Sequence, residues 1–328
     1  MKSEWASALR QSGQHRRAAH AYLFSGPPGL GQEDAALDLA RALNCHDAEP
    51  GRRPCRQCGP CRRISAGVHP DVHIEHPVGS HFRTEQVKEL LSQLSRSAFE
   101  GGWRVYVLAQ AECLTMEAAN RLLKILEEPP DQTVLVLSVP SPGEIAPTIV
   151  SRCQVITFNR WLEADLIDYL AAKQDLSETA ACALARIAGG NPGRAEQLLR
   201  AGALSDLRAV VFGIVEKLAA GDLLAMFEAA QSMEKTAEND ADFLQLFDAV
   251  WRDIQMCQAG MDSRSYYHCD EPDTIRRLAD ESPPVDLEGI LTVSCQLRHA
   301  LDARAARLLA YETACARVVS CLRDVRLW

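Results

Sequence analysis

The sequence lacks a long apolar run, a surplus of basic residues, internal repeats and low-complexity segments. No stretch approaches the roughly 20 consecutive apolar residues that span a membrane, so we expect no membrane segment. The N-terminal MKSEWASALRQSGQHRR has no apolar core of a secretory signal, which favours a cytoplasmic protein. The formal net charge is −9, whereas dedicated nucleic-acid binders are usually basic. Any contact with DNA is therefore expected to be local or made through partners.

What the sequence has is the composition of an ordinary globular protein, with 47% hydrophobic and 24% charged residues in 328. That length suggests two or three domains. Twelve cysteines without an export signal indicate reduced thiols, because the cytosol keeps cysteines reduced. Eight of them are scattered through apolar, mostly helical sequence and are interpreted as small core residues. The other four gather within residues 45–61.

The first 160 residues alternate short apolar runs with helical patterns, which is typical of an α/β domain. Buried strands are predicted at 21–26, 103–110, 132–139 and 153–158, with a further possible strand within 68–77. Helices are predicted at 34–45, 84–95 and 116–128. Strands alternating with helices imply a mainly parallel sheet that is covered on both faces.

The character of the sequence changes near Trp161. Short helices are expected from there to about residue 203, interrupted at GGNPGRA, and the remainder looks wholly helical with a break at Pro283 and Pro284. One apolar stripe at helical spacing is made by Phe243, Leu246, Phe247, Val250, Trp251 and Ile254. Such a stripe is most simply a buried helix face and not a ligand site.

The segment GPPGLGQED, residues 26–34, resembles a phosphate-binding loop in its glycines, Gly26, Gly29 and Gly31. A strand precedes it and a helix follows, as such a loop requires. Gln32, however, stands where the motif has the phosphate-binding Lys, and Glu33 stands where it has the Mg²⁺-binding Ser or Thr. Carboxylates at a helix N-terminus stabilise the helix and repel a triphosphate. The loop is therefore predicted to keep its shape without binding ATP.

A second part of the same machinery is missing after the strand predicted at 103–110. Nucleotide hydrolases of this kind end that strand in an acidic pair that serves the metal ion and the attacking water. Ala109 and Gln110 occupy those places here. Alanine cannot help to hold a metal, and an amide cannot accept a proton. Two independent losses favour a site that has no hydrolytic chemistry.

The clustered cysteines, Cys45, Cys55, Cys58 and Cys61, supply the four thiolates of a closed tetrahedral zinc site. Such a site leaves no position for a reactive water, so we expect structural zinc. Four reduced thiols without metal are the alternative.

Three other groups of charged or polar residues are given their plainer interpretation. The irregularly spaced histidines are expected to be ordinary polar residues, and they are His69, His73, His76 and His81. Five arginines around the cysteines form either a phosphate contact or a solvated basic surface, and they are Arg52, Arg53, Arg56, Arg62 and Arg63. The pair Glu127 and Glu128 is interpreted as charge at the end of a helix.

Four segments resemble, in order and separation, the bacterial DNA polymerase III clamp-loader subunits of the AAA+ superfamily. They are HAYLFSGPPGLG, the four-cysteine insertion, NRLLKILEEPP and TIVSRC. The resemblance covers residues 1 to about 200 closely and the helical remainder only in general character. The family includes an ATP-hydrolysing gamma/tau type and a delta-prime type with a degenerate nucleotide site. The losses at positions 32, 33, 109 and 110 make this chain similar to the delta-prime type.

The resemblance implies an AAA+ α/β domain over 1–160 with a zinc module at about 45–61, a helical lid over 161–203 and an all-α collar over 204–328. It implies a subunit without ATPase or polymerase activity of its own, in a ring that loads a sliding clamp on primed DNA. The expected partners are gamma/tau-type ATPase subunits and a delta-type subunit, with the clamp and DNA reached through the assembled ring.

The resemblance also assigns roles to single residues. Arg152 in the SRC segment corresponds to the family's arginine finger, which reaches the ATP of a neighbouring subunit; without the family it would be an ordinary surface residue. Arg194 falls near the family's second nucleotide sensor. The first sensor, a polar residue in the family, falls at Val139 and Pro140, and this departure also argues against ATP handling.

Two other classes of function remain open at this point. An active gamma/tau-type ATPase would need other groups to replace Gln32 and Ala109 in space. A separate zinc- and DNA-binding adaptor would place the function in RRPCRQCGPCRR, against the acidic balance of the chain.

Overall fold

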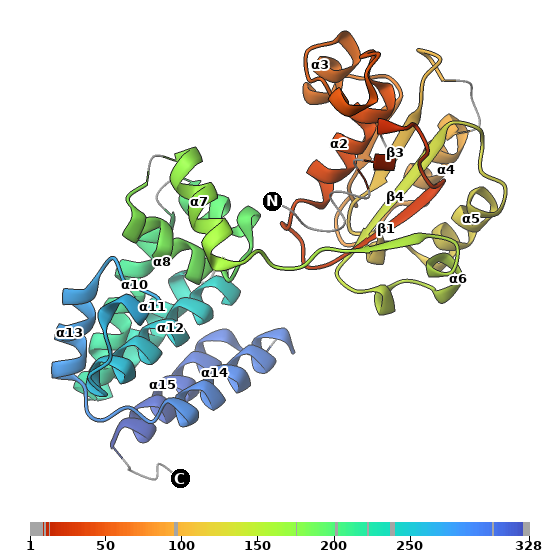
Figure 1. The fold of residues 1–328 in the computed structure, drawn as a ribbon. Helices are drawn as coiled ribbons and strands as arrows, with labels where there is room; N and C mark the ends of the chain where they lie inside the picture. Colours follow the sequence, from red (N-terminus) through yellow and green to blue (C-terminus); the bar gives the residue numbers. More distant parts are fainter. Residues whose placement is uncertain are drawn as a thin grey trace. The chain divides into compact units, whose positions relative to one another are not determined.

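The structure is a computed structural model that describes residues 9–323, apart from 10, 13, 95–97, 175, 201–202, 222, 237–239 and 304. The chain divides into two compact units, Met1–Arg160 and Trp161–Trp328. Figure 1 follows the chain from the first unit, which holds the strands, to the second, which is helical.

The first unit is built from strands and helices in alternation. Its strands are β1 (Ala21–Ser25), β2 (Val72–Glu75), β3 (Arg104–Leu108), β4 (Thr133–Val139) and β5 (Gln154–Thr157). Its α-helices are α2 (Gln32–Asn44), α3 (Gly59–Ser65), α4 (Thr84–Leu94), α5 (Met116–Glu127) and α6 (Pro147–Val150). Short 3₁₀ turns are η1 (Pro50–Arg52), η2 (Ala111–Cys113) and η3 (Pro142–Glu144).

The five strands form one sheet in the order β2-β3-β4-β1-β5, and every neighbouring pair is parallel. Tyr22 in the middle of the sheet pairs with Val136 on one side and Gln154 on the other. The predicted parallel sheet is therefore confirmed, and the possible strand within 68–77 is β2.

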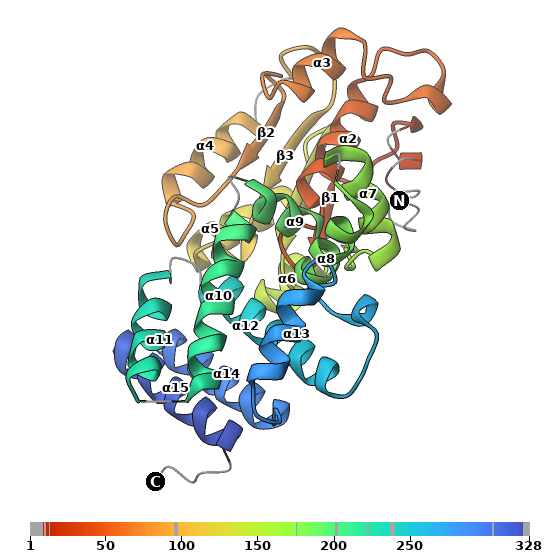
Figure 2. The same cartoon turned by 90° about the vertical axis from the view of Figure 1, so that its left-hand side faces the viewer.

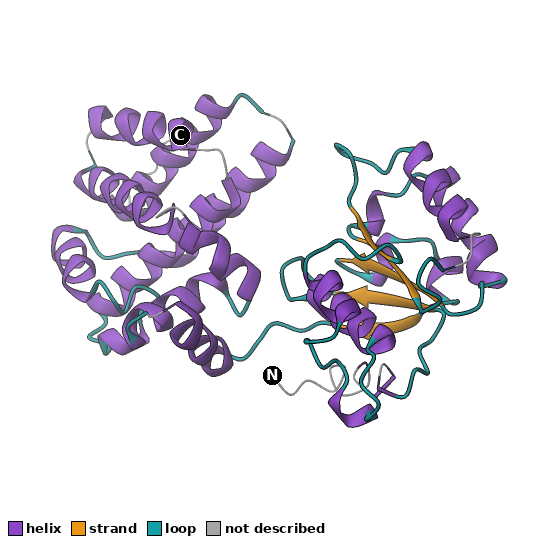
Figure 3. Cartoon of the chain, turned by 90° about the horizontal axis from the view of Figure 1, so that it is seen from above, coloured by secondary structure: helices purple, strands orange, loops and turns teal. Residues whose placement is uncertain are grey.

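Helices cover both faces of this sheet because alternate strand residues point to opposite sides. Leu135 and Leu137 of β4 belong to an apolar cluster with α4 and α5. Val134 and Val136 of the same strand belong to a second cluster with α2. Figure 3 shows the strands lying between the helices of this unit. The sheet is thus a rigid layer, and its loops carry the residues of interest.

One expectation about the sheet is wrong. Residues 153–158 were expected to form a buried strand, but Gln154, Val155 and Thr157 of β5 are exposed and Ile156 is buried. The reason is position: β5 pairs with β1 alone and stands at the edge of the sheet. An edge strand needs only one covered face.

The second unit consists of helices. They are α7 (Glu163–Gln174), α8 (Glu178–Ala188), α9 (Pro192–Leu199), α10 (Ala203–Ala220), α11 (Leu223–Thr236), α12 (Asp240–Gln258), α13 (Pro272–Glu281), α14 (Leu287–Asp302) and α15 (Arg307–Arg323), with a 3₁₀ turn η5 (Ser263–Ser265). Figure 2 shows α10 running beside α11 and α12, with which it packs.

One apolar core runs through this unit and contains residues of α7, α8 and α9 together with residues of α10 to α15. The apolar stripe predicted along α12 lies in that core, where Trp251 is fully buried. The predicted boundary between residues 203 and 204 falls inside this unit and stays a prediction. Among the described residues, no helix is both long and apolar enough to cross a membrane.

Candidate functional site

The loop after β1 sits at the edge of the sheet where the carboxyl ends of the parallel strands meet, the usual place for ligands in such folds. Gly26 begins the loop with φ 152°, and its N–H donates to the carbonyl of Val139 at 3.0 Å. A Cβ at Gly26 would lie 2.4 Å from the carbonyl oxygen of Phe158. Gly31 ends the loop with φ 94° and is the N-cap of α2. The glycines therefore serve the backbone path itself.

The side chain of Gln32 fills the inside of this loop. Its Nε2 donates to the carbonyls of Gly26 at 3.0 Å and Pro27 at 2.7 Å. Its Oε1 accepts from the backbone N–H of Leu30 at 3.1 Å. The residue is 5% exposed. The loop thus binds its own glutamine, and the Leu30 N–H is already taken by an oxygen of the same chain.

The start of α2 carries acidic side chains where a phosphate would approach. Glu33 and Asp34 lie in the first turn and are exposed. Nε2 of His76 lies 3.9 Å from the carboxylate of Glu33. Negative side chains there satisfy the helix dipole from within the chain.

The positions of the missing acidic pair lie directly after β3. Ala109 is buried, and its N–H donates to the carbonyl of Glu75 at 3.0 Å. Gln110 is exposed and adopts the left-handed conformation with φ 57°. Val139, at the expected first sensor, is buried in the sheet. These three positions offer no carboxylate to a metal ion.

Arg152 lies in the turn between α6 and β5, far along the chain from the loop that holds Gln32. Its backbone N–H donates to Ile149 O at 3.0 Å, which holds the residue in a tight turn. Its side chain is 36% exposed, and Nη2 contacts Oε1 of Glu127 at 2.7 Å. Nη1 donates to the carbonyl of Thr148 at 3.0 Å and to Oγ of Ser151 at 3.4 Å.

Glu127 is the residue that the sequence interpretation missed. We interpreted it only as part of a charge pair at the end of α5, but in the structure its carboxylate is the anionic partner of Arg152. Glu128, the other member of the pair, is the C-cap of α5 and lies on the exposed surface. The signal was weak because the two partners are 25 residues apart in sequence.

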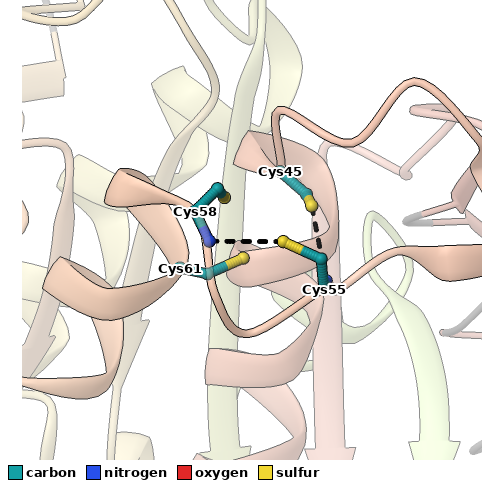
Figure 4. A group of neighbouring side chains, drawn as sticks. All are labelled: Cys45, Cys55, Cys58 and Cys61. Carbon is teal, nitrogen blue, oxygen red and sulfur yellow. Dashed lines mark hydrogen bonds between the residues drawn. The ribbon is translucent and has the colours of Figure 1, made fainter.

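The four clustered cysteines come together in space, as Figure 4 shows. Their Sγ atoms all lie within 4.8 Å of one another. Cys45 follows the end of α2, Cys58 is the N-cap of α3, and Cys61 lies within α3. Ligand sulfurs around a tetrahedral zinc are about 3.8 Å apart, because each Zn–S bond is about 2.3 Å. The cluster therefore fits a zinc ion after small adjustments.

Backbone N–H groups already point at these sulfurs. Asp47 N and Cys55 N each donate to Sγ of Cys45 at 3.4 Å, and Cys58 N donates to Sγ of Cys55 at 3.4 Å. Hydrogen bonds from the backbone N–H groups of Gln57 and Cys58 lower the pKa of Cys55 to about 6. Burial raises the pKa of Cys45 and Cys61. A bound cation would remove that penalty, because it replaces the thiol protons.

Most arginines of the cysteine segment have partners inside the chain. Arg52 pairs with Glu49 at 2.6 Å, Arg56 with Asp38 at 3.2 Å and Arg63 with Glu100 at 2.6 Å. Arg53 donates to backbone carbonyls, including that of Asp47 at 2.8 Å. Arg62 is exposed, and among the described residues its guanidinium has no hydrogen-bond or ion-pair partner. Three of the five arginines thus have carboxylate partners within the chain.

Among the described residues, the cysteine cluster is the one group of three or more side chains placed to hold a metal ion. The four histidines therefore do not form a metal site. His69 is buried, with Nε2 3.4 Å from Glu100 Oε2, and burial lowers its pKa. Nε2 of His73 lies 2.7 Å from the carbonyl of Pro70, and its ring stacks on Tyr106.

Arg194, at the expected second sensor, lies in the first turn of α9, and its guanidinium bonds to Asp242 and Gln245 of α12. Its charge is therefore used within the helical unit.

Known proteins resemble this chain over most of its length. Residues 1–161 match the protein family described as DNA polymerase III, delta subunit. The Bacillus subtilis (strain 168) protein named DNA polymerase III subunit delta' is 35% identical over 265 residues, which cover 79% of this chain and 78% of the relative. The Escherichia coli (strain K12) protein of that name is 28% identical over 295 residues, covering 89% and 86%. The Bacillus subtilis protein named subunit tau is 37% identical over 145 residues, covering 44% and 25%.

The chain therefore belongs to the DNA polymerase III clamp-loader family of the AAA+ superfamily. Within that family, proteins named subunit delta' match over most of their own length, and a Mycobacterium tuberculosis (strain ATCC 25618 / H37Rv) protein named subunit gamma/tau is 28% identical over 332 residues, covering 92% of this chain and 57% of the relative. The family resemblance and the predicted fold class are confirmed.

Proposed function

We propose that this chain is a non-hydrolysing, delta-prime-like subunit of a clamp-loading ring in the cytoplasm. It assembles with gamma/tau-type ATPase subunits and a delta-type subunit, and the ring places a sliding clamp on primed DNA. The proposal rests on the side-chain amide of Gln32, which is hydrogen-bonded to Gly26 O, Pro27 O and Leu30 N. These groups belong to the loop that resembles a phosphate-binding loop.

A phosphate would have to displace this amide and then meet no lysine in its place. The exposed acids of the first turn of α2 oppose a triphosphate further, and Ala109 provides no ligand for Mg²⁺. On this proposal, positions 32, 33 and 109 offer ATP neither a binding cation nor a metal site.

Arg152 is proposed to act as an arginine finger on the ATP of a neighbouring subunit. Its guanidinium is a permanently charged planar fork that matches phosphate oxygens, and it lies partly exposed on the surface of the first unit. Positive charge placed on the transferred phosphoryl group stabilises the transition state and is worth about 10³–10⁵ in rate in GTPases.

The zinc site has a structural part in this proposal. Cys45, Cys55, Cys58 and Cys61 would hold Zn²⁺, which joins the end of α2 to the start of α3. The pairing of the neighbouring arginines weighs against the adaptor alternative, in which this segment binds DNA. Because the chain also matches a protein named subunit tau, the experiment must distinguish the proposal from the alternative of an active ATPase.

The decisive experiment measures ATP binding by the isolated chain and ATP turnover by reconstituted rings. We expect no binding of a fluorescent ATP analogue at micromolar concentration. Rings with Arg152→Ala should assemble normally on gel filtration and lose clamp- and DNA-stimulated turnover at the site that Arg152 serves. Arg121→Ala is the matched control, because Arg121 is an exposed arginine that pairs with Glu117 on the same unit. Tight ATP binding with turnover by the chain alone would favour the ATPase alternative.

A further inference from the structure

Glu127 and Arg152 bring together two segments that β4 separates in the chain, the end of α5 and the turn after α6. The guanidinium contacts three acceptors: Oε1 of Glu127 at 2.7 Å, and the Thr148 carbonyl and Ser151 hydroxyl already described. The backbone of Arg152 is fixed as well, since Ile149, three residues earlier, is fully buried in the core of the first unit. The side chain is therefore ordered before any neighbouring subunit arrives.

This contact has little value for the stability of the fold. The side chains of Arg152 and Glu127 are 36% and 53% exposed, and ion pairs with that exposure contribute little to stability. The contact instead orients the guanidinium of Arg152. A free arginine side chain samples many rotamers, and its planar group donates hydrogen bonds only in fixed directions. Three of the five N–H groups have acceptors within the described residues, which leaves donors and the charge for an outside anion.

We propose that Glu127 is a positioning residue that holds the guanidinium of Arg152 ready for the nucleotide phosphate of a neighbouring subunit. The inference rests on the proposed function, in which Arg152 serves a neighbour. Glu127 acts through Arg152, with which its carboxylate pairs. Preorganisation of this kind affects the chemical step, because a charge already in place needs no reorganisation as the reaction proceeds.

If Glu127 restrained Arg152 and did not position it, replacing Glu127 would have the opposite effect on turnover. A carboxylate beside the guanidinium also competes with a phosphate, and if that competition dominated, removing Glu127 would speed ATP turnover. The sign of the effect therefore separates positioning from restraint.

The test uses full-length chain in rings reconstituted with gamma/tau-type and delta-type partners. The partners' own arginines at the SRC position are replaced by alanine, so that stimulated turnover depends on Arg152. We expect Glu127→Ala to lower kcat about three- to fivefold with KM for ATP nearly unchanged. Glu127→Gln should recover part of the loss, because its amide oxygen still accepts a hydrogen bond. Glu128→Gln, a neighbouring exposed carboxylate, is the control and should leave turnover unchanged.

A double variant decides whether the effect passes through the arginine. In an Arg152→Ala chain, adding Glu127→Ala should change nothing further. The inference is overturned if Arg152→Ala lowers turnover while Glu127→Ala leaves it unchanged or raises it. That result would still support Arg152 as an arginine finger. If neither substitution changes turnover in assembled rings, the proposed function of Arg152 itself fails. Additive losses in the double variant would show that Glu127 acts elsewhere.

Discussion

Arg194 of α9 donates through Nη2 to Oδ1 of Asp242 on α12, and the two side chains are 21% and 17% exposed. The position resembles that of a nucleotide sensor, yet the contact is between two helices of one unit. Gln245, which accepts from the same guanidinium, donates in turn to the carbonyl of Ile187 on α8. The arginine thus ties α8 and α9 to α12.

Arg194→Ala is accordingly expected to destabilise the helical unit by about 1–3 kcal/mol, because it removes the charged donor that Asp242 and Gln245 share. Urea unfolding followed by tryptophan fluorescence measures this, since Trp251 lies in the same core. Arg200→Ala, an exposed arginine after the same helix, is the control and should have little effect. Unchanged stability with reduced ATP turnover of rings would instead support a sensor role.

Gln32→Ala should cost about 1–3 kcal/mol of stability in the first unit. It leaves two loop carbonyls and the Leu30 N–H without their side-chain partner in a largely buried place. Chemical denaturation measures the loss, and Glu33→Gln on the same turn is the control, expected within about 0.5 kcal/mol. The variant should gain no ATP affinity, because alanine adds no cation. A loop indifferent to this substitution would mean that the glutamine does not hold its shape.

The cysteine cluster should carry about one zinc per chain, as a closed four-ligand site requires. Elemental analysis of protein purified without added metal checks this. Replacing Cys58 and Cys61 together by serine should abolish the zinc and loosen α3, with the sheet retained. Cys295→Ser, at an exposed cysteine of α14, should leave the metal content unchanged. Zinc retained by the double variant would place its ligands elsewhere.

Asp248 of α12 predicts a pH dependence. Burial raises the pKa of its carboxyl, partly offset by Ser294 and by Arg298, whose Nη2 lies 3.6 Å away. A folded pKa above the unfolded one means that ionisation costs stability at neutral pH; the cost starts to shrink as pH falls below the folded pKa and is gone below the unfolded pKa. Asp248→Asn should therefore be more stable than the natural chain at pH 7, by about 1 kcal/mol.

That advantage should shrink between pH 7 and pH 4, as the natural carboxyl becomes protonated. Denaturant midpoints of the two proteins across this range give the comparison. A gap that widens on acidification would show that the ionised carboxylate stabilises the fold, through Arg298.

The sequence was sufficient to predict the parallel sheet because its central strands are apolar on both faces. The strand at 153–158 was assigned too much burial, since alternation along a short strand does not reveal that it stands at an edge. The stripe along α12 was correctly interpreted as core, because Trp251 and its helical neighbours repeat at the spacing of one buried face.

The candidate site was less predictable. Position 32 could be identified as the wrong residue for a phosphate, but no pattern says that a glutamine there turns back onto Gly26 and Pro27. The partnership of Glu127 with Arg152 was equally hidden, because it depends on how two loops meet at the surface and not on local spacing.

Gly26 has a consequence for how such chains are recognised in genomes. A Cβ at Gly26 would lie 2.4 Å from the carbonyl oxygen of Phe158, so any larger residue would displace this backbone, whether or not a nucleotide is ever bound. Selection for folding alone therefore preserves the glycine fingerprint after the chemistry has gone. A glycine-pattern search would classify this chain among nucleotide hydrolases, and the informative positions for separating inactive members from active ones are 32 and 33, whose side chains would have to bind phosphate and Mg²⁺.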